Sequence, residues 1–169
     1  MFTRIRKSSG ILATLALTLV AAMLMPSAQA TVQYTTTHRN TVMNDIVTAA
    51  GTTAYVLIMG GTEPVNVAAA DSGTELAALP MSNPIGTVTN GVLTMSAITG
   101  EPAVATGTAT HYLLCTTSNV ANCTAASSTT RIAQGTIGTS GADMNFATTS
   151  IVAAATVNVS SWTMTAAGP

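Results

Sequence analysis

Two cysteines are the residues whose type and spacing point most clearly to chemistry. Cys115 and Cys123 are the only cysteines of the chain, and they lie at the top of a predicted hairpin with seven residues between them. Because the N-terminal segment discussed below predicts export, the pair predicts a structural disulfide, worth about 2–3 kcal/mol in the chain-entropy model. The alternatives are a redox-active pair, which usually has tighter spacing and a helix, and a zinc half-site, which lacks partners here.

The two histidines, His38 and His111, do not form a recognisable metal or catalytic motif. No His-x-x-x-His, His-Glu-x-x-His or Asp-rich calcium loop is present. Serines are plentiful, but there is no Gly-x-Ser-x-Gly, and no His–Asp pairing that spacing can support. We expect both histidines to be polar surface residues or partly buried structural residues. The predicted set of catalytic, cofactor-binding and metal-binding residues is therefore empty.

The acidic residues and the glycine pairs offer equally little specific chemistry. The six acids are scattered, and although Glu63 and Glu101 could meet in the fold, so could any other two. Gly60-Gly61 and the segment 138–141 lack the lysine of a phosphate-binding loop and are read as turns. We therefore expect no cofactor and no small-molecule substrate.

The first 30 residues have the pattern of a cleaved signal peptide. A cationic start precedes the uncharged apolar run Ile11 to Met25, and small residues follow at Ala28 and Ala30. This pattern predicts cleavage before Thr31 and one domain over 31–169. A membrane anchor is the alternative, but the run is short for a span of about 20 residues. We expect export to the periplasm, the cell surface or the medium, without a membrane segment after cleavage.

Loss of this leader would leave a domain with very few cations. Arg39 and Arg131 would remain against six acids, so the domain would carry four net negative charges. Two cations cannot neutralise many phosphates, which argues against nucleic-acid binding and against adsorption to an anionic membrane.

Composition predicts an all-β fold. Charged residues make up 7% of the chain and hydrophobic residues 47%, which is unlike a disordered chain. Threonine is abundant, and its methyl and hydroxyl groups suit strands that are exposed on one side. Turn signals punctuate short apolar runs, a pattern typical of a single β-sandwich or jelly-roll-like domain.

One short helix is predicted near the start of the domain. Before it, Val32 and Tyr34 alternate with polar residues through Thr36, as in a strand or an extended arm. Asn40 is expected to cap a helix that runs to Ala50 and ends at Gly51. We expect this helix to pack across one end of the sandwich.

The predicted strands follow one another with short loops between them. The clearest hairpin has Asn90-Gly91 at its turn, with Val88 facing Leu93. Polar or punctuated loops are expected at 97–105 and 118–128. The other predicted strands are a central buried strand over 53–59, a weaker strand over 75–79, and strands over 108–116 and 129–137. In the strand over 108–116, Tyr112 and Leu114 are expected on one side and His111, Leu113 and Cys115 on the other.

The stretch 131–165 is expected to close the fold. It reads as strand, turn, short strand, turn and long closing strand. In the last, Val157 and Val159 alternate with polar neighbours, and beyond Ser160-Ser161 the apolar positions shift by one to Trp162. Because such a shift reverses the faces of a strand, we predict a bulge at Ser160-Ser161 and a buried Trp162.

The chain from Thr31 to Thr165 resembles a family of small phage and prophage virion proteins. The resemblance implies a non-enzymatic, β-structured particle component. The chain departs from the family at His111 to Leu113, where the family has an aromatic pair and an Arg, and in having a secretion signal and the Cys115–Cys123 loop. The matching segments are Thr37-His-Arg-Asn40, Gly60-Gly-Thr-Glu-Pro64, Gly73-Thr-Glu-Leu76, Gly91-Val-Leu-Thr94, Gly107-Thr-Ala-Thr-His-Tyr112, Gly138-Thr-Ser-Gly-Ala-Asp143 and Thr148-Thr-Ser-Ile151.

These observations favour an exported, non-enzymatic structural protein that associates with itself or with other structural proteins. The extended arm with Val32 and Tyr34 is the predicted assembly element, because an uncharged alternating segment can pair with a strand edge. The same arm can instead fold back on its own sheet. Two other hypotheses remain open: a monomeric secreted binding module for a carbohydrate or cell surface, and a secreted hydrolase.

Overall fold

The computed structural model describes residues 33–159 and 162–166. The chain divides into two units, Met1–Val32 and Gln33–Pro169, and the description concerns the second. The predicted cleavage site at Ala28, Ala30 and Thr31, Val32 of the predicted arm, and the predicted bulge all lie outside the described residues. In the described part the protein is mostly β, with short strands and two helices, which confirms the predicted class.

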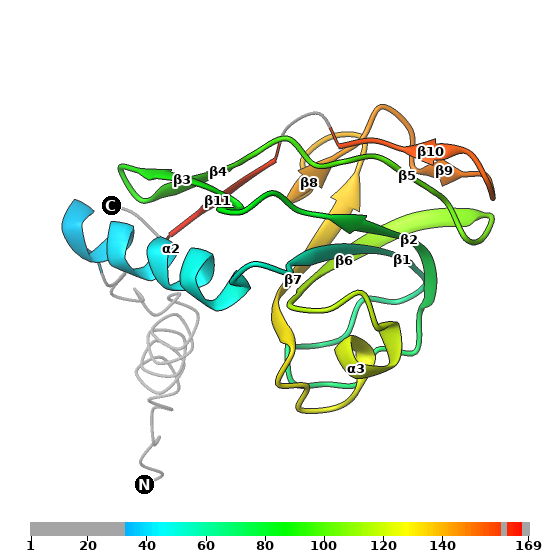
Figure 1. Cartoon of the computed structure of the whole chain (residues 1–169), viewed down its shortest axis with the longest axis horizontal. Coiled ribbons are helices and arrows are strands. Elements are labelled where there is room, and N and C mark those ends of the chain that lie inside the picture. The colour runs from blue at the N-terminus through cyan, green and yellow to red at the C-terminus, as the bar shows by residue number, and fades with distance from the viewer. Residues whose placement is uncertain (1–32, 160–161, 167–169) are drawn as a thin grey trace, which may run out of the picture. The chain divides into compact units, whose positions relative to one another are not determined.

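A six-stranded sheet forms the centre of the unit (Figure 1). Its strand order is β2-β1-β6-β7-β8, and β9 pairs with one end of β6. All pairs are antiparallel except β7 with β8. The predicted central strand is therefore confirmed, because β1 lies between β2 and β6. The strands are β1 (Tyr55–Gly60), β2 (Thr74–Pro80), β6 (Gly107–Cys115), β7 (Arg131–Gly138), β8 (Met144–Asn145) and β9 (Ser150–Ile151).

Two smaller sheets accompany the large one. A ribbon of β5 (Glu101–Pro102) and β10 (Thr156–Val157) lies in the predicted loop 97–105 and in the closing segment. The other small sheet has the order β11-β4-β3, with β3 (Gly86–Thr89), β4 (Val92–Met95) and β11 (Thr163–Thr165). Its hairpin is as predicted: Asn90 and Gly91 have φ of 54° and 78°, and Val88 pairs with Leu93.

The prediction of one long closing strand is wrong. β10 pairs with β5, whereas β11 pairs with β4 in a different sheet. The two phases of apolar residues around positions 160–161 therefore serve two sheets instead of one bulged strand. A period-two pattern reports only that a segment is extended and half-buried, and it does not report which edge the segment meets. The burial of Trp162 is nevertheless confirmed, at 3% exposure.

Helix α2 (Thr36–Ala50) begins four residues before the predicted start. Thr35 caps it by accepting a hydrogen bond from His38 N at 3.3 Å, so the strand predicted through Thr36 is wrong at its end. Asn40 does not cap the helix. Its Oδ1 instead accepts a hydrogen bond from Gly91 N at 2.6 Å, which ties α2 to the β3–β4 turn. Gly51, with φ of 61°, ends the helix as predicted.

The large sheet is buried on both faces, and β6 shows this most clearly. Tyr112 and Leu114 face the main core, whereas Leu113 and Cys115 face a second, smaller cluster with Cys123. This division agrees with the alternation predicted for the strand. A second helix, α3 (Val120–Thr124), occupies the segment predicted as a polar loop. No helix of the described part is long and apolar enough to cross a membrane.

Candidate functional site

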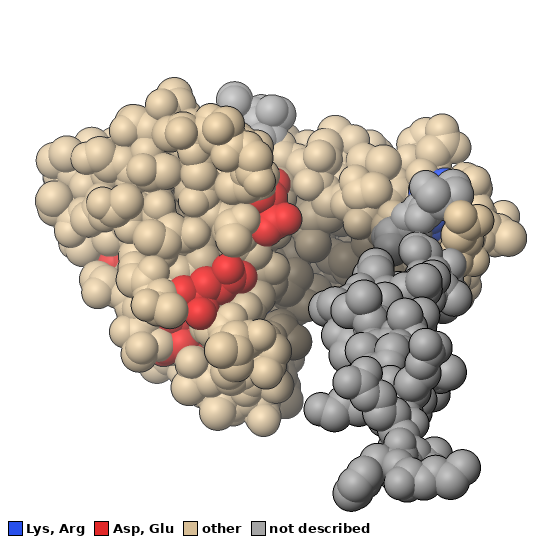
Figure 2. Space-filling model, turned by 180° about the vertical axis from the view of Figure 1, so that it is seen from behind, with Lys and Arg blue, Asp and Glu red and all other residues tan. Residues whose placement is uncertain are grey.

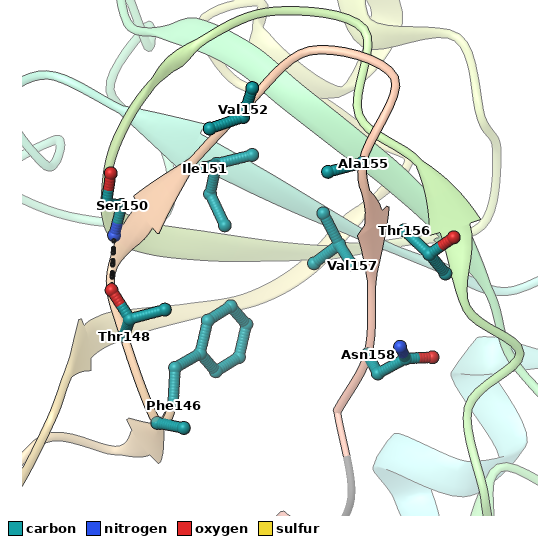
Figure 3. Close-up of a pocket in the computed structure, with 10 residues that line it drawn as sticks. Phe146, Thr148, Ser150, Ile151, Val152, Ala155, Thr156, Val157 and Asn158 are labelled. Atoms are coloured by element: carbon teal, nitrogen blue, oxygen red, sulfur yellow. Dashed lines mark hydrogen bonds between the residues drawn. The ribbon is translucent and has the colours of Figure 1, made fainter.

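An open hollow of about 350 Å³ lies between β9, β10 and the segment that leads to them (Figure 3). Phe146, Ile151 and Val157 point into it from three sides and supply its apolar surface. Ile151 and Val157 are also buried members of the main core, so the hollow is continuous with the packed interior. The hydroxyl and amide groups of Thr148 and Asn158 lie on its margin.

Local backbone geometry shapes this hollow. Thr148 Oγ1 accepts a hydrogen bond from Ser150 N at 3.2 Å, which turns the chain into β9. Ala154 adopts a φ of 66° in the tight connection from β9 to β10. The sequence predicts a turn before the closing strand but not its left-handed residue, because alanine gives none of the usual signals for that conformation.

The hollow is suited to contact and not to proton transfer. Its lining residues, 146–148, 150–152 and 155–158, include no Asp, Glu, His, Lys, Arg or Cys. Val152, 57% exposed, lies on its rim, and Val104, 65% exposed, projects beside it. Hydrogen bonds from Ala103 N to Ala155 O at 2.9 Å and from Ala154 N to Ala103 O at 2.8 Å hold their two segments together. The result is an uncharged apolar projection next to an uncharged apolar hollow.

Cys115 and Cys123 form a disulfide, as predicted. It joins the end of β6 to α3, and both cysteines are fully buried. Arg131 completes this region: its Nε donates to Cys123 O at 2.8 Å and its Nη1 to Ala69 O at 2.8 Å. Burial lowers the pKa of the Arg131 guanidinium, and the carboxylate of Asp71 acts in the opposite direction. The buried arginine therefore holds two loops against the second face of the sheet.

His111 is fully buried and is paired with an aspartate that spacing did not reveal. Its Nε2 lies 2.7 Å from Asp71 Oδ2, and its Nδ1 lies 3.0 Å from Thr110 Oγ1. The spacing of residues along the chain gave no sign of this His–Asp pair, because Asp71 comes from the distant loop that follows β1. We expected each histidine to be either a surface residue or a structural residue, and His111 is structural. His38 is exposed and lies against Tyr34, with ring centroids 4.9 Å apart.

The order Asp71–His111–Thr110 resembles a nucleophile relay, but the Thr110 hydroxyl has another acceptor for its proton. Thr110 Oγ1 lies 2.7 Å from Gly61 O, and a carbonyl oxygen can only accept, so the threonine proton is directed there. Thr110 has a single hydroxyl proton, so a hydrogen bond to Gly61 O leaves none for His111 Nδ1. An activated hydroxyl needs a base that accepts from it, so these side chains tie the loop after β1 to β6.

The remaining predicted residues lie apart. Glu63 is held by Gln134 Nε2 at 3.4 Å, whereas Glu101 lies on β5 opposite Val157. Among the residues that the structure describes, no group of three or more His, Cys, Asp or Glu side chains could hold a metal ion.

No protein-family model, curated protein or solved structure matches the chain.

Proposed function

We propose that this protein is an exported, non-enzymatic structural component that acts by associating with further copies of itself. The observation that carries the proposal is the uncharged projection of Val104 and Val152 beside the hollow lined by Ile151 and Val157. Two copies related by a twofold axis can each place a projection in the other's hollow, as a self-complementary interface requires. Exposed apolar surface next to a concave site is typical of protein contacts.

Export and family enter the proposal on separate grounds. The disulfide is a bond that persists in oxidising compartments, and with the predicted leader it supports export. The resemblance to phage and prophage virion proteins supports a role in a particle or cell appendage. Main-core residues come from both the large sheet and the β3–β4–β11 sheet, for example Leu114 and Leu93, which supports a sandwich-like arrangement.

The proposal is tested by the mass of the purified mature protein in solution over a wide concentration range, with electron microscopy of the same samples. Val152→Asp should weaken association at least tenfold, because it places a charge in an apolar contact. Val65→Asp is the matched control, since Val65 is 92% exposed on another loop. A wild-type protein that stays monomeric at every concentration, or equal loss of association in both variants, would refute the proposed interface.

A further inference from the structure

The indole N–H of Trp162 is buried without a hydrogen-bond partner among the described residues, and this points to a second site. The indole ring is packed edge-on against Tyr112, with centroids 4.6 Å apart and planes at 69°. No described residue supplies a hydrogen-bond acceptor for Nε1. A buried donor without an acceptor is costly, and such atoms in native proteins usually have a water or ligand as partner. Trp162 also lines a hollow of about 190 Å³ together with Asp143, Asn145 and Thr163.

Tyr112 and Asp143 converge next to this indole. A Cβ at Gly135 would lie 2.6 Å from Tyr112 Oη and 2.9 Å from Asp143 Oδ2, so the missing side chain is what lets the two oxygens approach. Burial raises the pKa of Tyr112, and so do the charges of Asp143 and Glu63. The Trp162 N–H acts in the opposite direction but does not meet hydrogen-bond geometry. The phenol is therefore a neutral hydroxyl beside a carboxylate.

Asp143 keeps one oxygen available. Its Oδ2 accepts hydrogen bonds from Thr136 N at 2.9 Å and from Thr136 Oγ1 at 2.8 Å. Oδ1 has no hydrogen-bond partner among the described residues. The backbone and side chain of one β7 residue thus fix the carboxylate, while its second oxygen is free to accept from a ligand.

A larger hollow of about 330 Å³ adjoins the first and shares Asp143 and Thr163 with it. Its lining mixes neutral polar groups, such as the Gln134 amide, with the apolar side chains of Met43 and Met164. Figure 2 shows acidic side chains that border a recess on one face of the described molecule, where few Lys or Arg atoms appear. Among the described residues, Asp143 is the one charged residue that lines either hollow, so the charge at the site is negative.

These groups select the chemistry of a ligand. The indole N–H needs an acceptor, which a cation cannot be, and the carboxylate repels an anion. A hydroxyl group meets both demands, because it accepts from Nε1 and donates to Asp143 Oδ1. We propose that the two hollows bind a neutral saccharide, with one hydroxyl reaching Trp162 and the sugar ring lying over Met164. This site is separate from the proposed contact at Val152, so either can fail without the other.

The proposal is tested by titrating the ¹⁵N-labelled mature protein with glucose, galactose, mannose and N-acetylglucosamine and with their disaccharides. Trp162 is the single tryptophan, so its indole N–H gives one isolated NMR signal. We expect a saturable shift of that signal with at least one of these sugars. Asp143→Asn should weaken binding at least tenfold, whereas Glu101→Gln, which removes a charge on β5, should leave it unchanged.

Trp162→Phe provides a second variant, because it keeps an aromatic ring and removes the N–H donor together with part of the indole. Calorimetry with the same sugar should show weaker binding. Three outcomes would overturn the proposal. The first is an indole signal that none of the sugars shifts, which is also the result expected if the N–H contacts only a bound water. The second is equal affinity in Asp143→Asn and the wild type. The third is saturation by sodium acetate or calcium chloride in place of sugar.

Discussion

Trp162 is the residue at which the three-stranded sheet meets the core of the six-stranded sheet. Its carbonyl accepts a hydrogen bond from Met95 N at 3.0 Å, next to the end of β4, and its ring packs against Tyr112 of β6. The backbone and the side chain of one residue therefore couple two sheets that share no strand. Replacement of Trp162 should therefore destabilise both sheets.

Replacement of Trp162 by Ala is expected to lower the free energy of unfolding by about 3–5 kcal/mol, as for other large core aromatics. Urea titration followed by circular dichroism measures this change. In the folded wild type, iodide should quench the fluorescence of Trp162 far less than in the unfolded chain. Free quenching in the native state would contradict the burial on which the prediction rests.

Glu75 on β2 should make stability depend on pH. Burial raises the pKa of Glu75 above its ordinary value of 4.5, so the folded state holds this proton to higher pH than the unfolded state does. The free energy of unfolding therefore falls as pH rises from 4.5 through the folded-state pKa. Glu75→Gln removes that loss and should raise the melting temperature at neutral pH, with little effect below pH 4.5.

The control for this change is Asp45→Asn on the exposed face of α2, which also removes one negative charge. A gain of equal size in both variants would show that net charge, and not burial of Glu75, is responsible. Melting curves at neutral and acidic pH separate the two causes.

At the scale of elements, the structure holds the loop after β1 and the segment around α3 by polar and covalent contacts more than by a large apolar core. The second cluster has few members, with Cys115 and Cys123 among them. Arg131 supplies hydrogen bonds to carbonyls in both segments. The disulfide and the arginine therefore act on the same part of the fold.

Replacing both Cys115 and Cys123 by Ala is expected to reduce the free energy of unfolding by about 2–3 kcal/mol, the loop-closure value for so short a loop. Chemical denaturation of the variant and of the oxidised protein measures the difference. Hydrogen exchange should increase most in the segment 116–130. An increase that is uniform over the sheet would contradict the local role of the bond.

The elements that the sequence predicted well are those defined by local signals. The hairpin at Asn90-Gly91, the buried β1 and the two faces of β6 all follow from turn chemistry or residue alternation. The predictions failed where a distant partner decides the outcome. β10 and β11 join different sheets, and Asn40 serves the β3–β4 turn instead of its own helix.

The candidate sites were harder to foresee than the fold for the same reason. Asp71 and His111 are far apart in sequence and belong to different elements. The convergence of Tyr112, Asp143 and Trp162 depends on the absence of a side chain at Gly135. No motif records such a coincidence, because its members share no fixed spacing.

At the scale of the whole molecule, the predicted leader determines at which residue the exported protein begins. We expect protein recovered from the periplasm or medium to begin at Thr31, because Ala28 and Ala30 match a signal-peptidase site. Intact-mass spectrometry of the secreted protein decides this directly. A mass that includes residues 1–30 would show that the leader is retained, and the export part of the proposed function would then fall.

The burial of Arg131 has a consequence for the resistance of the protein to proteases. No lysine occurs beyond residue 7 of the chain, and Arg39 and Arg131 are the only arginines of the described part. Trypsin-like proteases need an accessible Lys or Arg in a chain that can unfold locally. Arg131 is buried at the start of β7, and Arg39 lies inside α2. The described part of the domain thus offers such proteases no Lys or Arg in a loop, which would be an advantage in the exported setting that we propose.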